Sequence, residues 1–242
     1  MNYRYNDYDI LCPKMYSQFL NEVFIIDVYR TSYLRRGDLV LDLGAATGDF
    51  CIIASKKVGD LGEVVAVEPN IEDFRLLKEN IERNECKNII PVNLAVGSCD
   101  GEKEMTFWGR QFKCRIKTLE GILHEFNIRD QPKFIKMDIE GEELGVVSKC
   151  LPIVVRSRVV SLEFHDTKQG MDELLLPNGF SFKPITMRYV YKKLLTNSIL
   201  HPSAFCSSVL TYFKEDRFKL HKLVTGFDMT KGSLMTGSYI RA

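Results

Sequence analysis

The chain has 242 residues, of which 45% are apolar and 27% charged, and its formal net charge is +1. This length and composition are typical of a globular protein with one large core, and a charge near zero argues against polyanion binding as its main task. The seven cysteines form no C-x-x-C pair, so we interpret them as reduced apolar residues and not as a disulfide set or a zinc site. The sequence shows neither a secretory leader nor an apolar run long enough to cross a bilayer, and cytoplasm is the expected location.

Residues 1–36 are expected to form an N-terminal extension. Residues 1–12 show no clear periodicity and are predicted to be a loosely held arm. After Pro13, apolar residues recur every three to four positions, which predicts a helix. The residues of this stripe are Met15, Phe19, Val23, Ile26 and Tyr29.

Residues 40–50, VLDLGAATGDF, combine a short apolar strand with a glycine turn and the start of a helix. Such a turn lets a ligand approach the backbone, and the helix that follows offers unpaired N–H groups. The dinucleotide pattern G-x-G-x-x-G fails here, because Ala46 and Asp49 stand where its second and third glycines would be. Asp42 and Asp49 repel a pyrophosphate but suit a ligand with cationic groups, such as the sulfonium and ammonium of S-adenosylmethionine.

A second apolar strand, residues 63–68, ends in Glu68, which comes 26 residues after Asp42. An acidic residue near this distance reaches a ribose diol in folds of this kind, and one carboxylate can accept from both hydroxyls. We therefore predict that Asp42, Gly44, Gly48 and Glu68 belong to one binding site. The alternative is a ligand-free turn with Glu68 at a solvated strand end.

The rest of the chain alternates predicted strands with amphipathic helices. Strands are expected at residues 88–93, 133–138, 158–164, 180–185 and 234–240, and helices at 50–57, 70–84, 118–126 and 171–176. Residues 104–108 are strand-like, and the basic stretch 110–117 is interpreted as a solvated loop. This order predicts an α/β fold with a doubly wound, mostly parallel sheet of seven strands. Residues 187–232 are predicted to be a helical insert, with a helix-like stretch at 203–213.

These motifs resemble the FkbM-type S-adenosylmethionine-dependent methyltransferases, which have the Rossmann-like class I fold. The matching segments are VLDLGAATGDF at 40–50, VVAVEPN at 64–70, NLAVG at 93–97, KTLEGIL at 117–123, FIKMDIEGEE at 134–143 and LEFHD at 162–166. The resemblance covers roughly residues 37–180. It implies one methyltransferase domain over residues 37–242.

The resemblance also implies that S-adenosyl-L-methionine is the cofactor, and it indicates which residues bind it. Those beside the methionine part are Asp42, Gly44, Ala45 and Gly48. Those beside the ribose and adenosine are Glu68, Pro69 and Asn70. Those near the adenine are Asn93, Leu94 and Ala95, while Asp138 faces the cofactor from the end of its strand.

Methyl transfer to a hydroxyl needs in-line alignment and removal of a proton. The candidates for this role are Asp138, Glu140, Glu163 and His165, and His165 is preferred because its ordinary pKa of about 6.5 suits proton transfer at neutral pH. Asp138, Glu140 and His165 can also hold a divalent ion, but nothing in their spacing requires one and no metal is expected. Glu143 is interpreted equally well as an acid that complements a helix dipole.

The predicted function is O-methylation of a small-molecule or saccharide hydroxyl. The missing glycines disfavour a nicotinamide-dependent dehydrogenase. An RNA-modifying methyltransferase, disfavoured by the near-neutral charge, and a cofactor-binding module without catalysis are the alternatives. The insert at 187–232 is expected either to shape the acceptor pocket or to form a homodimer contact.

Overall fold

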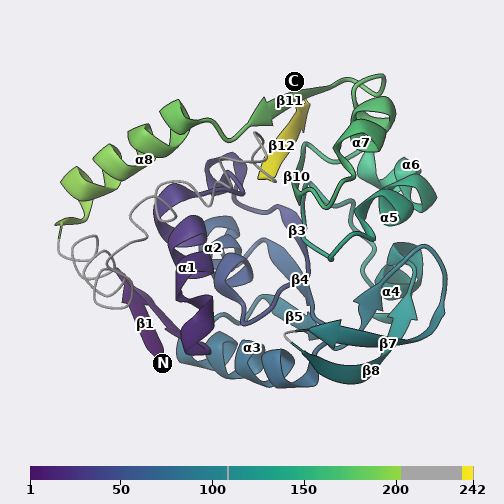
Figure 1. Ribbon diagram of the computed structural model, residues 1–242, viewed down its shortest axis with the longest axis horizontal. Helices are drawn as coiled ribbons and strands as arrows, with labels where there is room; N and C mark the ends of the chain where they lie inside the picture. Colours follow the sequence, from purple (N-terminus) through teal and green to yellow (C-terminus); the bar gives the residue numbers. More distant parts are fainter. Residues whose placement is uncertain (108, 203–235, 242) are drawn as a thin grey trace.

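The computed structural model of the protein describes residues 1–107, 109–202 and 236–241. A seven-stranded sheet with the order β11–β12–β10–β9–β3–β4–β5 runs through the middle of the molecule (Figure 1). Its strands are β3 (Leu39–Leu43), β4 (Glu63–Val67), β5 (Ile89–Val92), β9 (Phe134–Met137), β10 (Val159–Glu163), β11 (Phe180–Pro184) and β12 (Thr236–Arg241). β12 is antiparallel to both of its neighbours and all other pairs are parallel, so the predicted mostly parallel sheet is confirmed.

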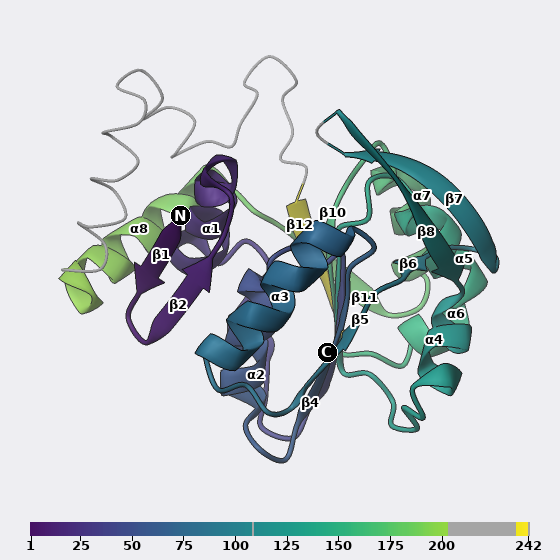
Figure 2. The same ribbon diagram turned by 90° about the horizontal axis from the view of Figure 1, so that it is seen from below.

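Helices cover both faces of this sheet, as the view in Figure 2 shows. One face carries α2 (Asp49–Val58) and α3 (Ile71–Arg83), and the other carries α4 (Leu119–Glu125), α5 (Glu143–Lys149), α6 (Leu151–Val154) and α7 (Lys168–Leu175). Successive residues of a strand point to opposite faces, and in β4 Val64 belongs to one apolar core and Val65 to the other. A strand buried on both sides must be apolar throughout, which explains the continuous apolar runs in the sequence.

Residues 1–12 form an antiparallel hairpin, so the prediction of a loosely held arm is wrong. The hairpin consists of β1 (Asn2–Tyr5) and β2 (Tyr8–Leu11). Ile10 is completely buried, and the Asn80 side chain of α3 accepts from the Leu11 N–H at 2.7 Å and donates to its carbonyl at 2.8 Å. These side-chain bonds satisfy the backbone at the edge of the hairpin, a long-range pairing that local periodicity does not reveal.

The predicted helix after Pro13 is broken into short pieces. They are a 3₁₀ turn (Lys14–Tyr16), α1 (Ser17–Asn21), a π-helical turn (Glu22–Ile26) and a second 3₁₀ turn (Thr31–Tyr33). Asp27 stops the helix because its backbone is left-handed, with φ at 58°, and its side chain accepts from the Thr31 N–H at 2.6 Å. Met15 and Phe19, which were expected on the buried face, are exposed.

The basic stretch after residue 109 is a strand, which corrects its interpretation as a solvated loop. β6 (Ala95–Val96), β7 (Gly101–Phe107) and β8 (Arg110–Lys117) form a second, three-stranded sheet with β8 in the centre. Along β8, Cys114 is buried while Lys113 and Arg115 are exposed. This period of two is the strand pattern, and the basic residues only mark the solvent face.

Helix α8 (Met187–Leu200) forms the first part of the predicted insert and packs on the N-terminal segment (Figure 1). The Tyr189 hydroxyl donates to the Asp27 carbonyl at 2.9 Å, and Lys193 pairs with the Asp27 carboxylate at 2.6 Å. The predicted helix-like stretch at 203–213 lies outside the described residues. Across the described ranges, no helix combines the length and the apolar character needed to span a membrane.

Gly44→Ala is expected to destabilise the fold by about 3 kcal/mol or more, because overpacking adds to backbone strain. The new Cβ would lie 1.8 Å from the Asp138 carbonyl oxygen, at a residue whose φ is +81°. Urea unfolding of the wild type and of Gly44→Ala measures the loss of stability. Gly101→Ala is the matched control, since its Cβ would meet no atom within 4 Å, and equal stability of the two variants would contradict the assigned packing.

Candidate functional site

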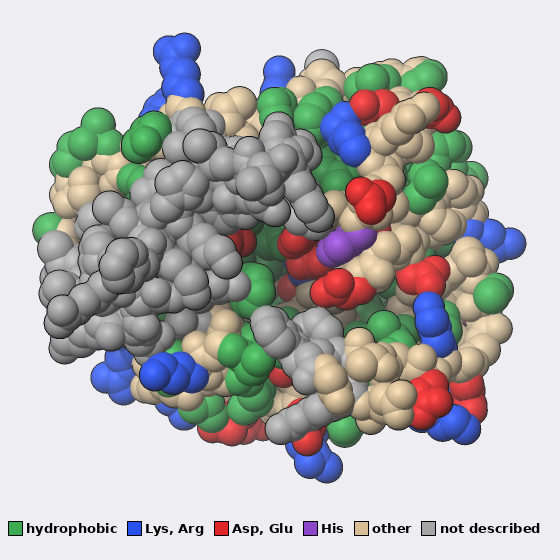
Figure 3. All heavy atoms as spheres, in the orientation of Figure 1, with side chains coloured by type: hydrophobic (Ala, Val, Ile, Leu, Met, Phe, Trp, Pro, Cys, Tyr) green, Lys and Arg blue, Asp and Glu red, His purple; other side chains and the backbone are tan. Residues whose placement is uncertain are grey.

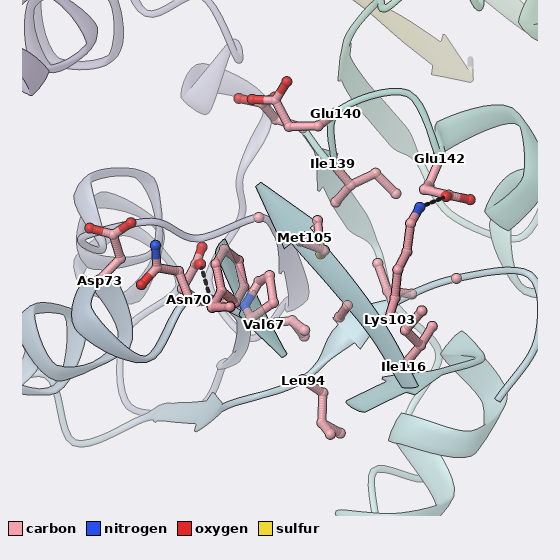
Figure 4. Close-up of a pocket in the computed structure, with 18 of the residues that line it drawn as sticks. Val67, Asn70, Asp73, Leu94, Lys103, Met105, Ile116, Ile139, Glu140 and Glu142 are labelled. Carbon is pink, nitrogen blue, oxygen red and sulfur yellow. Dashed lines mark hydrogen bonds and ion pairs between the residues drawn. The ribbon is translucent and has the colours of Figure 1, made fainter. Parts of the chain in front are cut away.

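A cavity of about 430 Å³ opens where the parallel strands β3, β4 and β9 end (Figure 4). Parallel strands present their carboxyl ends at one edge of a sheet, which is where open α/β folds bind ligands. Eight residues expected at the site from the sequence line this cavity: Gly44, Glu68, Pro69, Asn70, Leu94, Ala95, Asp138 and Glu140. Four expected cofactor residues, Asp42, Ala45, Gly48 and Asn93, are not among the residues that line the cavity, and His165 lies next to the lining residue Glu140.

The glycine turn is held by backbone bonds that leave its surface free for a ligand. The N–H groups of Gly44 and Ala45 both donate to the Val67 carbonyl at 2.9 Å, which joins the end of β3 to the end of β4. Gly48 caps α2 with φ at 95°, a conformation that favours glycine. Ala45 and Gly48 therefore shape the turn from behind, while Gly44 faces the cavity.

Asp42 lies beneath this turn and forms a buried ion pair. The Lys136 ammonium is 3.2 Å from the Asp42 carboxylate and donates to the Gly44 carbonyl at 2.5 Å. Burial alone would lower the pKa of Lys136, but the carboxylates of Asp42, Asp138 and Asp49 outweigh it and raise that pKa. Burial also raises the pKa of Asp42, and the neighbouring Lys136 ammonium opposes that shift. Asp42 thus fixes the turn through Lys136.

Glu68 ends β4 with its carboxylate at the cavity wall. One oxygen accepts from the Ala46 N–H at 2.8 Å and the other accepts from the Asn70 N–H at 2.7 Å. Each carboxylate oxygen has two acceptor sites, so both oxygens retain capacity for a diol. Burial raises the pKa of Glu68 to about 8. The Asn93 side chain donates to the Glu68 carbonyl at 2.8 Å and so supports the loop from behind.

The other end of the cavity is acidic. Asp138 follows β9 and accepts a hydrogen bond at 3.1 Å from the hydroxyl of Tyr29, a residue of the N-terminal segment. Burial, with the Asp138 and Glu22 carboxylates nearby, raises the pKa of Glu163 to about 8. Burial and the neighbouring Asp138 and Asp49 raise the pKa of Glu22 to about 7. Figure 3 shows acidic side chains grouped around a histidine beside a hollow in this face.

His165 is held by a fully buried carboxylate. Its Nδ1 lies 2.9 Å from Glu143 Oε1, which also accepts from the N–H groups of Ile139 and Gly141 at 3.1 Å. The hydrogen bond to Glu143 raises the pKa of His165 to about 9. The pKa of His165 therefore lies above the ordinary value of about 6.5, and Glu143 is an anchor for His165 besides being an acid in the first turn of α5.

Asp138, Glu140 and His165, grouped from the sequence, do lie together. Each offers one potential ligand atom, and these atoms are within 4.8 Å of one another. They come from the loops that follow β9 and β10, two adjacent strands, which explains why residues so far apart in the sequence meet. This is the place in the described chain where a metal ion can be held by three side chains.

One wall of the cavity was not predicted from the sequence motifs. It is built by the β6–β8 sheet, with Met105, Thr106, Phe112 and Ile116 facing the cavity. Lys103 of β7 pairs with Glu142 at 2.7 Å and connects this sheet to the loop after β9 (Figure 4). The alternation of Phe112, Cys114 and Ile116 was the signal that could have identified the wall.

Comparison with known proteins gives a family match. The model of the methyltransferase FkbM domain matches residues 42–188. A ribosomal protein L11 methyltransferase of Thermotoga neapolitana is 30% identical over 99 residues, which are 40% of this chain and 37% of that protein. An arsenite methyltransferase of Halobacterium salinarum is 36% identical over 53 residues, which are 22% of this chain and 14% of that protein. The chain thus matches less than half the length of either curated relative.

Comparison with solved structures gives two further matches. An FkbM methyltransferase from Methylobacillus flagellatus has a TM-score of 0.48 at 20% identity, over 64% of this chain and 42% of that chain. A precorrin-6y C5,15-methyltransferase from Geobacter metallireducens has a TM-score of 0.45 at 14% identity, over 72% of this chain and 76% of that chain.

Glu68→Gln is expected to flatten the dependence of stability on pH in the unliganded protein. The carboxyl pKa rises from 4.5 to about 8 on folding, so between these values the folded chain keeps a proton that the unfolded chain has lost. Stability of the wild type must therefore fall as pH rises through this window. Urea unfolding at about pH 5 and about pH 8 measures how strongly the free energy of unfolding depends on pH in the wild type and in the variant. A variant with the same pH dependence as the wild type would contradict the buried carboxyl.

Proposed function

Because the chain belongs to the FkbM methyltransferase family, we propose that it transfers the methyl group of S-adenosyl-L-methionine to a hydroxyl of a small molecule or saccharide. The observation that carries the proposal is one cavity with a carboxylate suited to a ribose at one end and an acidic group beside a histidine at the other. The family match includes both ends, since Glu68 and His165 lie within residues 42–188.

The cavity fits the proposed cofactor in size, shape and charge. Its volume of about 430 Å³ lies within the usual range for a small-molecule site. Gly44 lines the cavity, so a ligand can contact the backbone of the turn. Glu68 can accept from the ribose hydroxyls, while the Asp138 carboxyl, which also lines the cavity, complements a cationic group of the cofactor. S-adenosylmethionine supplies an activated methyl group whose departure leaves a neutral thioether.

The residues of the chain align the acceptor and receive its proton. Asp138 and Glu140 can bind the hydroxyl at the cavity end. At neutral pH the imidazole of His165, with its pKa near 9, holds a proton on each nitrogen and cannot accept another. Proton removal then falls to the two carboxylates, and His165 becomes competent as the pH rises.

The acidic end of the cavity supports a neutral acceptor over a nucleic acid. Asp138 and Glu140 repel phosphate groups, and no described lysine or arginine forms an ion pair with either of them. A polyhydroxylated molecule, by contrast, offers donors to these acceptors.

Glu68→Ala is expected to weaken binding of S-adenosylhomocysteine by about 1.5–3 kcal/mol, the cost of losing charged hydrogen bonds. Calorimetric titration measures the dissociation constant. Glu63→Ala is the matched control, because Glu63 is the exposed residue at the other end of β4. A dissociation constant that is unchanged in the Glu68 variant would refute the ribose assignment.

Glu140→Gln is expected to lower methyl transfer by roughly tenfold or more while cofactor affinity stays the same, since Glu140 acts on the acceptor. The measurement is transfer of labelled methyl from S-adenosylmethionine to a panel of sugars, hydroxylated small molecules and tRNA. Methylation of tRNA alone would replace the proposed acceptor class. Transfer to a hydroxyl at an unaltered rate in the variant would remove Glu140 from the acceptor site.

A further inference from the structure

Two side chains of the acidic end are spaced as ligands of a common ion. Glu140 Oε2 lies 3.6 Å from His165 Nε2. This distance exceeds that of a good hydrogen bond. It does match the separation of two atoms that each lie about 2.1 Å from one metal ion. A carboxylate oxygen of Asp138 completes a triad whose ligand atoms all lie within 4.8 Å of one another.

His165 is already oriented for coordination, and an ion bound at its Nε2 would displace the proton from that nitrogen. Its Nδ1 is bound to Glu143, whose side chain is fully buried, so Nε2 faces Glu140. Nε2 has no hydrogen-bond partner among the residues that the structure describes. Histidines that bind metals in proteins are fixed in the same way, by a carboxylate on the other ring nitrogen.

Acidic side chains gather around the three candidate ligands. Asp138 lies close to both Glu140 and Glu163, and the nearby Lys136 is paired with Asp42. Within the described part of the chain, no lysine or arginine forms an ion pair with Asp138, Glu140 or Glu163. Carboxylates that converge in this way attract a multivalent cation.

We propose that Asp138, Glu140 and His165 bind one divalent cation at the acceptor end of the cavity. Two carboxylates and one imidazole suit an ion such as Mn²⁺, which accepts both oxygen and nitrogen ligands. Three protein ligands leave coordination positions open. Resting on the proposed function, the role of this ion is to hold the acceptor hydroxyl at such a position and to make its proton easier to remove.

The proposal is tested by titrating the full chain with Mn²⁺ alone. The electron paramagnetic resonance signal of the free ion reports how much Mn²⁺ stays unbound. One ion per chain is expected to bind. Glu140→Gln and His165→Gln should each weaken binding by roughly tenfold or more. The Glu140 side chain is more than half exposed, at 57%, so its variant stays informative even where changes at Asp138 disturb folding.

Asp166→Asn is the control for charge without coordination. Asp166 is an exposed neighbour of His165 and is not among the three ligands, and asparagine tolerates its φ of 59°. The Mn²⁺ affinity of this variant should change by less than about twofold, as expected for an exposed charge that solvent and salt screen. Equal weakening in the control and in Glu140→Gln would overturn the site, as would a wild type that leaves millimolar Mn²⁺ free.

Binding of S-adenosylhomocysteine in the presence of a chelator separates this inference from the proposed function. If S-adenosylhomocysteine binds and Mn²⁺ does not, the cation site is refuted and the methyltransferase proposal stands. If Mn²⁺ binds at the triad and S-adenosylhomocysteine does not, the cation site stands and the methyltransferase proposal is refuted.

Discussion

The buried ion pair of Asp42 and Lys136 is the constraint on which the site depends. The two residues are opposite each other on adjacent strands β3 and β9, and their side chains are 0% and 5% exposed. Removing one partner would leave a buried charge unpaired, which costs about 3–5 kcal/mol. Because Lys136 also donates to the Gly44 carbonyl, the pair fixes the glycine turn on the sheet. A buried ion pair in the core therefore positions the part of the cavity wall that the glycine turn forms.

Around this turn, the chain collects acidic groups from several segments. Tyr29 reaches Asp138 from the N-terminal segment, and Glu143 ties the loop after β9 to His165 after β10. Burial makes the nearby carboxyls of Glu22 and Glu163 harder to ionise, so a cationic ligand that pairs with them recovers part of that cost. This explains how a chain with a net charge of +1 can present a strongly acidic site.

Much of the sheet could be predicted because its strands are apolar on both faces, and the glycine turn could be predicted because its backbone demands glycine. The N-terminal hairpin could not, since its stability comes from Asn80 and from packing on α3. Buried and exposed residues alternate clearly along strand β8, but its basic residues suggested a solvated loop. The pKa of His165 depends on Glu143, 22 residues away in the sequence, and no local pattern encodes that contact.

The central claim is that the cavity at the carboxyl edge of the sheet binds S-adenosylmethionine and not a dinucleotide. Parallel calorimetric titrations of the wild-type chain with S-adenosylhomocysteine and with NAD test it most directly. The structure predicts one site of micromolar affinity for the first ligand and no heat of binding for the second. Binding of NAD without binding of S-adenosylhomocysteine would contradict the assignment of S-adenosylmethionine to this cavity.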